Sequence, residues 1–495
     1  MTAILAAIPL AAVLVAMGAL HLSAALAGAI GLGMAALIAL IVFDLAAAAP
    51  GGLSAAALGT AAEALHSTGA ILWIILPALA LFEYQERSGA IGRIRTALTG
   101  LTEDRRLQAI LIAWFFGLFI EGAAGFGAPV ALAAPLLAGL GYAPVRAVAL
   151  ALLGHAAGVS FGAVGTPTLA QIELSGLSPT TLAGTVAAMQ AAAGGVLMLA
   201  MVRMAGDRPL TRADLGWAGL AMVCFFVPAL GFAWIAGPEL ASLGGALVGA
   251  VAFIALLRRA EPGPLPPLKT LLPDLAPYLA ILALVLITRL VGPLTETLRG
   301  VALAWALPEA FSGRFEPLYH PGTLLFAGLA IAALVTGRLT PLGSSIGPAL
   351  ARLLPVAAAL LMMLSLSRLM VHSGMIDALA AGAAGAGAAW PMLAPWVGIL
   401  GTFITGSATT SNILFTEFQI ATATTLSLSP LALVAVQGFG SAVGNVVAPH
   451  NIIAGSATVG LVGKEGTVLR KTLLPAAIAA LIGGAIALWL GAALA

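Results

Sequence analysis

The stretch "FIEGAAGFGAPVALAAPLL", residues 119–137, places an acidic residue, Glu121, inside an apolar run and then gives up most side-chain bulk. Gly, Ala and a single Phe occupy the next seven positions, and Pro129 follows them. A carboxyl group is costly inside a bilayer unless it is paired or functional. Glycines let the backbone itself approach a ligand. This stretch therefore predicts an interrupted membrane segment rather than a plain spanning helix.

The composition identifies the solvent of this chain. Of 495 residues, 61% are hydrophobic and 8% are charged, and the mean hydropathy is +1.10. A soluble domain carries roughly 25% charged residues, whereas apolar stretches of about 17 to 25 residues cross a hydrocarbon core of roughly 30 Å. We predict an all-α polytopic membrane protein with about 12–14 transmembrane helices.

Other global features exclude several classes of protein. The net charge of +2 gives no nucleic-acid footprint, and the single cysteine, Cys224, excludes disulfide frameworks. Since no Lys or Arg precedes Arg87, the N-terminal apolar segment reads as a first membrane segment rather than a cleaved signal. No cofactor and no metal site is expected.

Apolar stretches outline the expected spans. They lie near 3–20, 22–43, 69–86, 107–120, 142–160, 180–202, 213–236, 238–257, 273–292, 321–337, 354–372, 391–405, 429–447 and 472–492. The segments 121–141 and 406–428 are too rich in Gly, Ser, Thr and Asn for ordinary spanning helices. Residues 53–66 and 344–353 are expected to form short interfacial helices.

The cations predict the orientation, because cytoplasmic loops carry an excess of Lys and Arg. Five clusters mark loops on the inside: Arg87, Arg93, Arg95, Arg105 and Arg106; Arg203, Arg208 and Arg212; Arg258, Arg259 and Lys269; Arg338 and Arg352; Lys464, Arg470 and Lys471. The loops 293–320 and 373–390 are expected outside. Both termini then face outward.

The chain also repeats itself at a nearly constant offset. "RSGAI" at 87–91 returns as "HSGMI" at 372–376, "FIEGAA" at 119–124 as "FITGSA" at 403–408, and "YAPVRAVAL" from 142 as "LSPLALVAV" from 428. Coincidence of small residues is the competing interpretation. The loop after the first "SGAI" is rich in Arg and the loop after "SGMI" has none, so the two repeats should have opposite orientations.

Inverted repeats are typical of secondary transporters, whose substrate lies at the repeat interface near the bilayer midplane. We expect an N-terminal half at 1–257 with a repeat core near 69–204. A cytoplasmic linker at 258–272 should precede a C-terminal half at 273–495, with its core near 354–492.

The two interrupted segments supply the candidate substrate site. Unwound helices free backbone N–H groups, and helix N-termini favour anions. Hydroxyls and amides can bond a carboxylate. The competing interpretation of each single Gly is tight helix packing. The candidates are Gly122, Ala123, Gly125 and Gly127 in the first segment, and Gly406, Ser407, Thr409, Thr410, Ser411 and Asn412 in the second.

Two further segments combine Gly, Pro and polar residues, "GVSFGAVGTPT" at 158–168 and "GSAVGNVVAPHN" at 440–451. Each is expected to be the unwound middle of a spanning helix. Ser160, Thr166, Asn445 and Asn451 are candidate contacts, and Gln171 is a weaker one.

Three titratable residues are candidates for proton coupling: Glu121, His155 and His450. For Glu121 a structural role remains open, and each His has hydrogen bonding alone as its alternative. Arg368 matches Glu83 in the repeat, and we expect it to snorkel to the outer surface rather than to attract substrate. Ordinary loop charges are expected at Asp44, Glu103 and Asp104.

Four motifs resemble the L-lactate permease family of bacterial secondary transporters: "FIEGAAGFGAPVA", "FGAVGTP", "TGSATTSN" and "GLVGKE" at 460–465. The resemblance implies symport of L-lactate, glycolate or other small 2-hydroxymonocarboxylates with protons across the inner membrane. It also implies kinship with inverted-repeat carriers that have re-entrant hairpins, many of which are thought to move as elevators. Whether the protein forms a homo-oligomer stays open.

Two positions depart from that family. Members usually read like "TGSDTSSN", and this chain has Ala408 in place of the acid; "APHNI" at 448–452, with His450, replaces a family-like "SPQSI". Sodium coupling or a different organic anion is therefore the alternative to lactate–proton symport. An intramembrane enzyme is disfavoured because no known catalytic motif appears, and matched broken segments argue for alternating access over a channel.

Overall fold

The computed structural model describes residues 2–45, 52–263, 268–307, 311–461 and 463–493. Within these residues, 12 helices are long and apolar enough to cross a membrane. Three shorter apolar helices accompany them: α1 (Thr2–Gly18), α8 (Ala128–Gly139) and α16 (Pro321–Val335). The predicted polytopic helical fold, with about 12–14 spans, is therefore confirmed.

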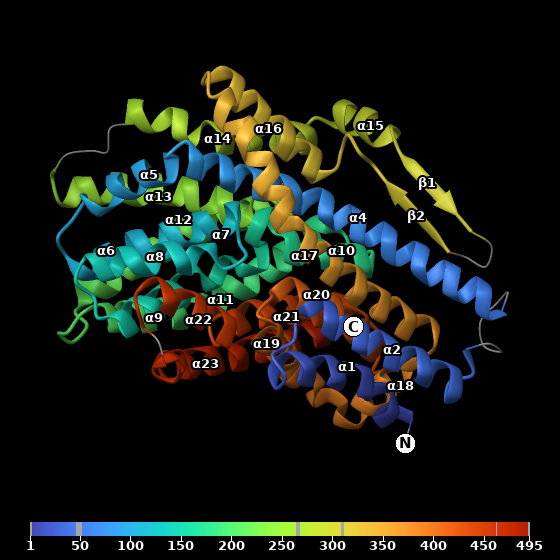
Figure 1. Cartoon of the computed structure of the whole chain (residues 1–495). Helices are drawn as coiled ribbons and strands as arrows, with labels where there is room; N and C mark the ends of the chain where they lie inside the picture. Colours follow the sequence, from blue (N-terminus) through green and yellow to red (C-terminus); the bar gives the residue numbers. More distant parts are fainter. Residues whose placement is uncertain (1, 46–51, 264–267, 308–310, 462, 494–495) are drawn as a thin grey trace.

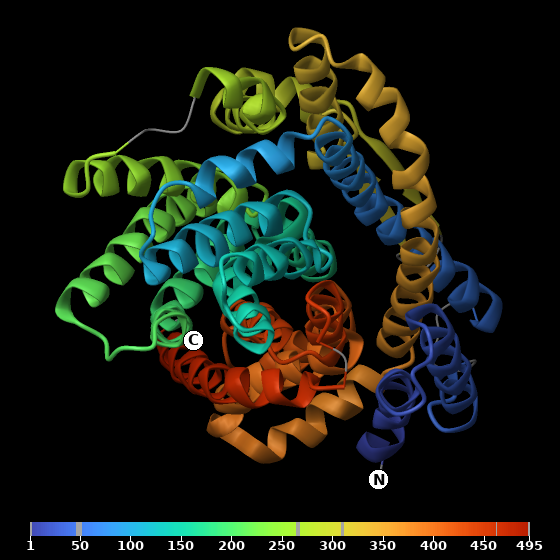
Figure 2. The same ribbon diagram turned by 60° about the vertical axis from the view of Figure 1, so that its left-hand side comes forward.

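One group of helices forms a curved layer, which we call the arch. It consists of α1, α2 (Ala24–Ile41), α4 (Gly52–Arg87), α5 (Ala90–Thr99), α14 (Leu268–Leu290), α15 (Gly292–Gly300), α16 and α17 (Leu339–His372). Its long helices α4 and α17 pack on each other, and α17 also packs on α2. Figure 2 shows the arch bending around one side of the remaining helices.

The remaining helices form the core. From the first half these are α6 (Arg105–Ala109), a π-helical stretch (Ile110–Phe116), α7 (Gly117–Ala123), α8, α9 (Pro144–His155), a 3-10 stretch (Ala156–Phe161), α10 (Gly162–Ser175), α11 (Pro179–Ala205), α12 (Arg212–Ile235) and α13 (Ala241–Ala260). From the second they are α19 (Trp390–Thr405), α20 (Ala408–Thr425), α21 (Pro430–Asn445), α22 (Pro449–Thr458) and α23 (Glu465–Ala493). The helix α18 (Met375–Ala383) and a 3-10 stretch (Ala384–Ala389) lead from α17 to α19. Figure 1 shows the α7–α11 and α19–α23 regions side by side.

The two segments related by the sequence repeat contain the same order of elements. A long helix, α4 or α17, ends just before a glycine with a left-handed backbone, Gly89 (φ 70°) or Gly374 (φ 74°), which begins the short helix α5 or α18. A helical hairpin follows in each segment, α7–α8 or α19–α20, and then an interrupted helix, α9–α10 or α21–α22. The opposite orientation of the two segments stays a prediction.

Several expected boundaries were wrong. The segments 53–66 and 344–353 are not separate short helices but lie in the first halves of α4 and α17, which continue through internal prolines, Pro77 in α4 and Pro348 and Pro355 in α17. The helices α13 and α14 extend into the predicted linker 258–272, part of which lies outside the described residues. The loop 293–320 contains helix α15 and an antiparallel hairpin of β1 (Leu303–Ala306) and β2 (Ser312–Phe315), with Leu303 opposite Phe315.

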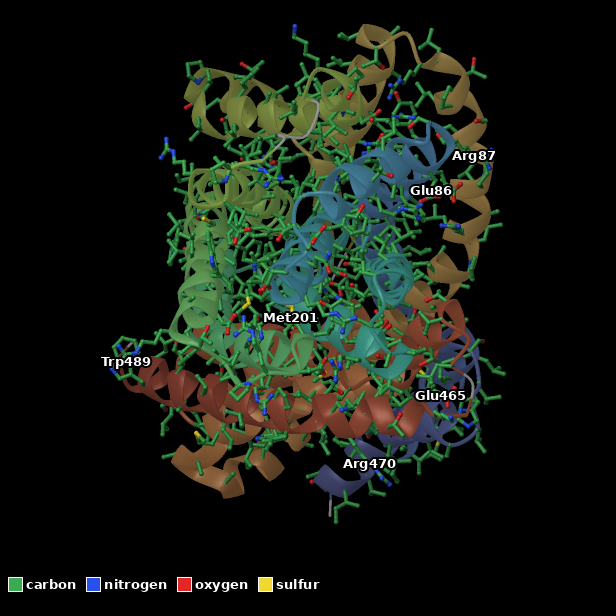
Figure 3. All side chains as sticks on the ribbon, turned by 90° about the vertical axis from the view of Figure 1, so that its left-hand side faces the viewer. Glu86, Arg87, Met201, Glu465, Arg470 and Trp489 are labelled. Carbon is green, nitrogen blue, oxygen red and sulfur yellow. The ribbon has the colours of Figure 1, made fainter. Side chains whose placement is uncertain are left out.

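The outer surface of the helices is apolar, as lipid contact requires. Trp489 on α23 is 68% exposed and stands out from the ribbon in Figure 3, and Val335 on α16 is 81% exposed. Charged side chains such as Glu86, Arg87 and Arg470 lie at helix ends in the same view. Lipid rather than water surrounds this part of the surface, so its exposed apolar side chains carry no hydrophobic penalty.

Core and arch meet through ion pairs with a common polarity. In the described part of the chain, three pairs cross this boundary: Glu173 with His66 (4.0 Å), Glu239 with Arg289 (2.8 Å) and Glu417 with Arg368 (3.1 Å). The core supplies the acid in each pair, and the arch supplies the base. Arg368 therefore does not snorkel to the surface as expected but pairs with Glu417 and, at 3.9 Å, with Glu63.

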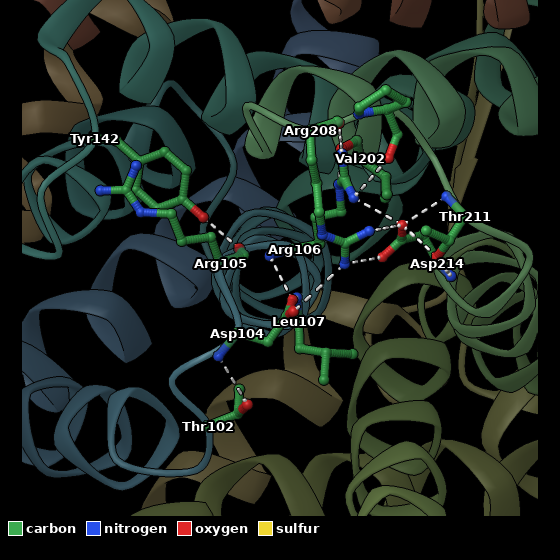
Figure 4. Close-up of polar contacts among 11 residues, drawn as sticks. Thr102, Asp104, Arg105, Arg106, Leu107, Tyr142, Val202, Arg208, Thr211 and Asp214 are labelled. Atoms are coloured by element: carbon green, nitrogen blue, oxygen red, sulfur yellow. Dashed lines mark hydrogen bonds and ion pairs between the residues drawn. The ribbon is translucent and has the colours of Figure 1, made fainter.

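A second ionic cluster lies inside the core at the predicted cytoplasmic end. Arg106, at the start of α6, lies 2.7 Å from Asp214 of α12 and donates to the carbonyls of Val202 and Arg208 (Figure 4). Asp214 also caps α12 through Thr211 and accepts from Arg208. Arg106 and Asp214 are both buried, so each offsets the cost of burying the other's charge, and Arg208 gives Asp214 a second counter-charge.

Candidate functional site

The tips of the two helical hairpins define the site. The first tip joins α7 to α8 through Gly125, Phe126 and Gly127, whose φ angles are 56°, 48° and 81°. The second joins α19 to α20 through Gly406, at φ 71°, and Ser407, whose hydroxyl accepts from the N–H of Thr410. Both tips therefore depend on left-handed backbone, which glycine adopts without steric cost.

The interruption of the α9–α10 helix packs directly on the first tip. Ala163, Val164 and Gly165 also have left-handed angles. A Cβ on Gly125 would lie 2.9 Å from the nitrogen of Ala163, and a Cβ on Gly165 would lie 2.8 Å from the carbonyl carbon of Pro238. These glycines are needed because the backbones touch at this point, and the first tip has no room to move towards the broken helix.

A small cavity of about 60 Å³ lies between the two tips and the broken helix. Its lining residues are Glu121, Gly125, Phe126, Gly127, Val159, Gly162, Ala163, Thr166, Pro167, Gly406, Ser407, Ala408, Thr409 and Asn445. A water molecule needs roughly 10–15 Å³ by this type of measure. The cavity therefore suits a few water molecules or a ligand with few non-hydrogen atoms.

Many of the residues predicted from the sequence meet in this cavity. Both hairpin tips and both interrupted helices contribute, and the predicted residues among its lining are Glu121, Gly125, Gly127, Thr166, Gly406, Ser407, Thr409 and Asn445. The other candidates, Gly122, Ala123, Ser160, Thr410, Ser411 and Asn412, lie near it but do not line it. Segments nearly 300 residues apart in the sequence thus build one site.

The candidates outside the lining have visible packing partners. Gly122 lies against the backbone of Leu243, so α7 can approach α13 closely. Ser160 donates to the carbonyl of Gly438 (3.2 Å) and accepts from Gln190 (3.0 Å). Thr410 contributes its N–H to the Ser407 cap. These contacts hold the helices around the cavity together.

Ser411 and Asn412 connect α20 to its neighbours. The Ser411 hydroxyl donates to the carbonyl of Gly398 (2.8 Å), and the Asn412 amide donates to the carbonyl of Pro167 (3.1 Å). Since Pro167 lines the cavity, Asn412 attaches hairpin α19–α20 to the broken helix. The weaker candidate Gln171 makes a similar bond, from its amide to the carbonyl of Val434 (2.8 Å).

Glu121, His155 and Asn445 form one buried polar cluster at the cavity wall. His155 Nδ1 lies 2.6 Å from the carbonyl oxygen of Ala151, which only accepts, so Nδ1 carries a hydrogen. The Nε2 atom lies 3.3 Å from Asn445 Oδ1 and 3.9 Å from Glu121 Oε2. In the neutral imidazole this Nε2 has no hydrogen. A proton on Nε2 would let the ring donate to Asn445 Oδ1, whereas Glu121 Oε2 lies beyond hydrogen-bond distance of Nε2.

His450 and Asn451 lie at the edge of the site, at the start of α22. His450 is exposed and lies against Gly406, where a Cβ would meet the His450 Cβ at 2.8 Å. The Asn451 amide donates to the carbonyl of Asn445 (3.3 Å). Neither residue lines the cavity, although His450 lies against Gly406, which does.

Three helix N-termini converge on the cavity. Gly127 precedes α8, Thr166 begins the regular part of α10 after the left-handed residues, and Ala408 begins α20. The first N–H groups of a helix have no partner within it and carry partial positive charge. An anion in this cavity would therefore meet several N–H groups as well as the hydroxyls of Ser407 and Thr409, whereas the Thr166 hydroxyl donates to the carbonyl of Ala163 (2.6 Å).

Part of the lining was not predicted from the sequence. Phe126, Val159, Ala163 and Pro167 line the cavity with apolar side chains, as does Ala408, which the sequence had marked as a departure from the family. Gly162 was not predicted either, and a Cβ there would clash with Glu121 Oε1. The patterns "GFG" and "FGAVGTP" could have indicated these lining residues, because they place larger side chains directly beside glycines at the interruptions of the helices.

The comparisons with known proteins agree with this architecture. The model of the L-lactate permease family matches residues 2–265 and 277–493. The chain belongs to the L-lactate permease family. Its similar relatives include the glycolate permease GlcA of Escherichia coli K12, which is 30% identical over 99% of this chain and 95% of the relative. The L-lactate permease of Streptococcus iniae is 29% identical over 86% of this chain and 92% of that relative.

These relatives are permeases, so this member of the family is a membrane transport protein and not an enzyme. Among solved structures, the YdaH transporter of Alcanivorax borkumensis is similar, with a TM-score of 0.50, 17% identity and coverage of 86% of both chains. At that identity the likeness extends to the fold alone, which is that of a polytopic helical transporter.

Proposed function

We propose that this protein imports L-lactate, glycolate or a related small 2-hydroxymonocarboxylate together with protons. The observation that carries the proposal is the position of the Glu121 carboxyl in the wall of a small cavity onto which three helix N-termini converge. The N-termini and hydroxyls suit a carboxylate and a neighbouring hydroxyl. The relatives named as glycolate and L-lactate permeases support this choice of substrate.

Electrostatic repulsion links substrate binding to a proton in this proposal. A substrate carboxylate and an ionised Glu121 would be like charges in one buried cavity, which is unfavourable. Binding of the anion therefore goes with uptake of a proton by the Glu121–His155 pair, whose facing atoms are 3.9 Å apart. Release of both on the other side of the membrane completes one symport cycle. Proton uptake by Glu121 and His155 does not require the acidic residue that other family members usually have at the position of Ala408.

The division into arch and core supports alternating access by movement of the core. The residues that line the cavity all belong to the core, whereas the arch contributes none of them. We propose that the core carries the site across the inner membrane of a bacterium while the arch stays in place. The inverted repeat would give the two end states, with both termini outside.

Proteoliposome uptake tests the proposal. Vesicles that contain the protein should accumulate labelled L-lactate when an inward proton gradient is imposed in sodium-free buffer, and a protonophore should abolish the accumulation. A panel of lactate enantiomers, glycolate, pyruvate and acetate as competitors then ranks the substrates. Accumulation that ignores the protonophore and needs sodium would identify a sodium-coupled carrier instead. Failure of every acid in the panel would point to a different organic anion.

A further inference from the structure

The lining of the cavity combines polar and apolar side chains. The polar side chains are those of Glu121, Thr166, Ser407, Thr409 and Asn445, and the largest apolar side chain is that of Phe126. A 2-hydroxy acid also has polar groups and an apolar part. Its carboxylate and hydroxyl need hydrogen bonds, whereas the substituent on C2, a hydrogen in glycolate and a methyl in lactate, needs none.

Phe126 is held in place at a conformational cost. It has φ 48° between two glycines that also have left-handed angles, a conformation that bulky residues rarely adopt. The Phe126 side chain is 48% exposed. Because Phe126 lies at a hairpin tip beside the cavity and not on a spanning helix, contact with lipid does not explain this exposure. Strained residues that persist at a ligand site are often part of its function.

The rest of the wall has little freedom to widen. The tip backbone is against the broken helix, since a Cβ on Gly125 would lie 2.9 Å from the Ala163 nitrogen. Val159 and Ala408 are buried, at 2% and 5% exposure, and belong to a small cluster with Ala442. Phe126, in contrast to the buried Val159 and Ala408, is thus a bulky lining side chain that is not packed on all sides.

We propose that the Phe126 side chain limits the size of the C2 substituent that the transporter accepts. This inference rests on the proposed transport of 2-hydroxymonocarboxylates. The polar groups would fix the carboxylate and hydroxyl, and the substituent would then point at the apolar wall that Phe126 completes. Glycolate and lactate fit against this wall, and acids with longer chains meet the ring.

The test compares acids of increasing chain length in wild type, Phe126→Leu and Phe126→Ala. Initial uptake of labelled L-lactate is measured in proteoliposomes with glycolate, 2-hydroxybutyrate and 2-hydroxyvalerate as competitors. One methylene in an apolar pocket typically changes selectivity by 10- to 200-fold. We expect the preference for 2-hydroxyvalerate over lactate to rise by about tenfold or more in Phe126→Ala, with a smaller rise in Phe126→Leu.

Phe119→Leu is the matched control. Phe119 lies on the same hairpin but packs against Tyr278, with ring centroids 4.6 Å apart, away from the cavity. Its substitution should leave the ranking of the four acids as in wild type. Variants that no longer transport are assayed by thermal stabilisation with the same acids, which measures binding alone.

The outcomes separate this inference from the proposed function. If wild type accepts lactate and the ranking is the same in all three variants, Phe126 does not set the size limit and the inference is overturned. If the ranking shifts equally in Phe119→Leu, the effect is a general loosening of the hairpin, and the inference fails as well. If wild type binds none of the acids, the proposed substrate class is itself wrong.

Discussion

The Oε2 atom of Glu121 lies 3.9 Å from Nε2 of His155, and the two side chains, 6% and 2% exposed, are buried beside the cavity between the hairpin tips. Helices α7 and α9 bring them together, and the Ala151 carbonyl fixes the ring by accepting from Nδ1. Either the carboxyl or the imidazole of this pair can hold a proton.

Glu121→Gln should separate transport from proton coupling. Glutamine imitates the protonated carboxyl in shape and charge but cannot release a proton. Lactate uptake driven by a proton gradient should fall at least about tenfold, equivalent to about 1.4 kcal/mol, because a carrier that takes up no proton gains nothing from the gradient. Exchange of internal for external lactate should continue. Gradient-driven uptake at the wild-type rate would remove Glu121 from the coupling step.

Glu86→Gln is the control for this substitution. Glu86 is exposed near the end of α4, far in sequence from the cavity residues and absent from its lining. The same chemical change there should leave both uptake and exchange intact.

Thr409→Val and Ser411→Ala should have different effects, although only one residue lies between them. Thr409 lines the cavity, whereas the Ser411 hydroxyl donates to the Gly398 carbonyl inside the core. A hydrogen bond to a charged group is worth about 1.5–3 kcal/mol, so Thr409→Val should raise the KM for lactate about tenfold or more. Ser411→Ala should lower the thermal midpoint and leave KM near wild type. A KM effect of equal size in both variants would contradict the placement of the site.

Arg106→Ala should destabilise the fold without altering substrate selectivity. Removal of this guanidinium leaves the buried Asp214 with fewer counter-charges, and loss of one partner of a buried pair typically costs about 3–5 kcal/mol. The thermal midpoint in detergent should fall accordingly. Asp207→Asn is the control, because that side chain is 69% exposed in its pair with Arg146 and solvent-exposed ion pairs contribute little to stability. Equal midpoints for the two variants would argue against the cluster as an anchor.

His320 should make the protein less stable in mild acid. Burial, and secondly the nearby Arg289, lower the pKa of this histidine to about 4. Its Nδ1 accepts from the N–H of Gly322 at the start of α16, which the protonated ring cannot do. In the unfolded chain the pKa is about 6.5. As pH falls from about 6.5 to about 4, His320 therefore binds a proton in the unfolded state but stays neutral in the folded state. The free energy of unfolding declines over that range.

His320→Asn preserves an N-cap acceptor without the titration. The thermal midpoint of this variant should decline less between pH 7 and pH 4.5 than that of wild type. Parallel curves for the two proteins would show that another group is responsible for the acid sensitivity.

The sequence predicted the two hairpin tips and the two interrupted helices well, because the physical signals are strong. An acid followed by glycines, or six polar groups in nine residues, is incompatible with a plain lipid-exposed helix. Glycines at the element junctions, such as Gly89 and Gly374, appear as matching motifs for the same reason: both take a left-handed backbone. The boundaries of α4 and α17 were missed because Glu63 and His66 do not end α4, and Pro348 and Pro355 do not end α17.

Composition and periodicity by themselves determined that this chain is a helical membrane protein, since its few charged residues cannot solvate a surface in water. Only the tertiary structure decided which polar groups share a cavity. Asn412 and Ser411, among the most prominent candidates in the sequence, satisfy backbone carbonyls of neighbouring helices, whereas Asn445 and Thr166 reach the cavity. The direction of a side chain depends on how helices far apart in sequence pack. Residues 119–137 illustrate the difference. The role of their glycines could be predicted from the sequence, but the proximity of Glu121 to His155 on α9 could not.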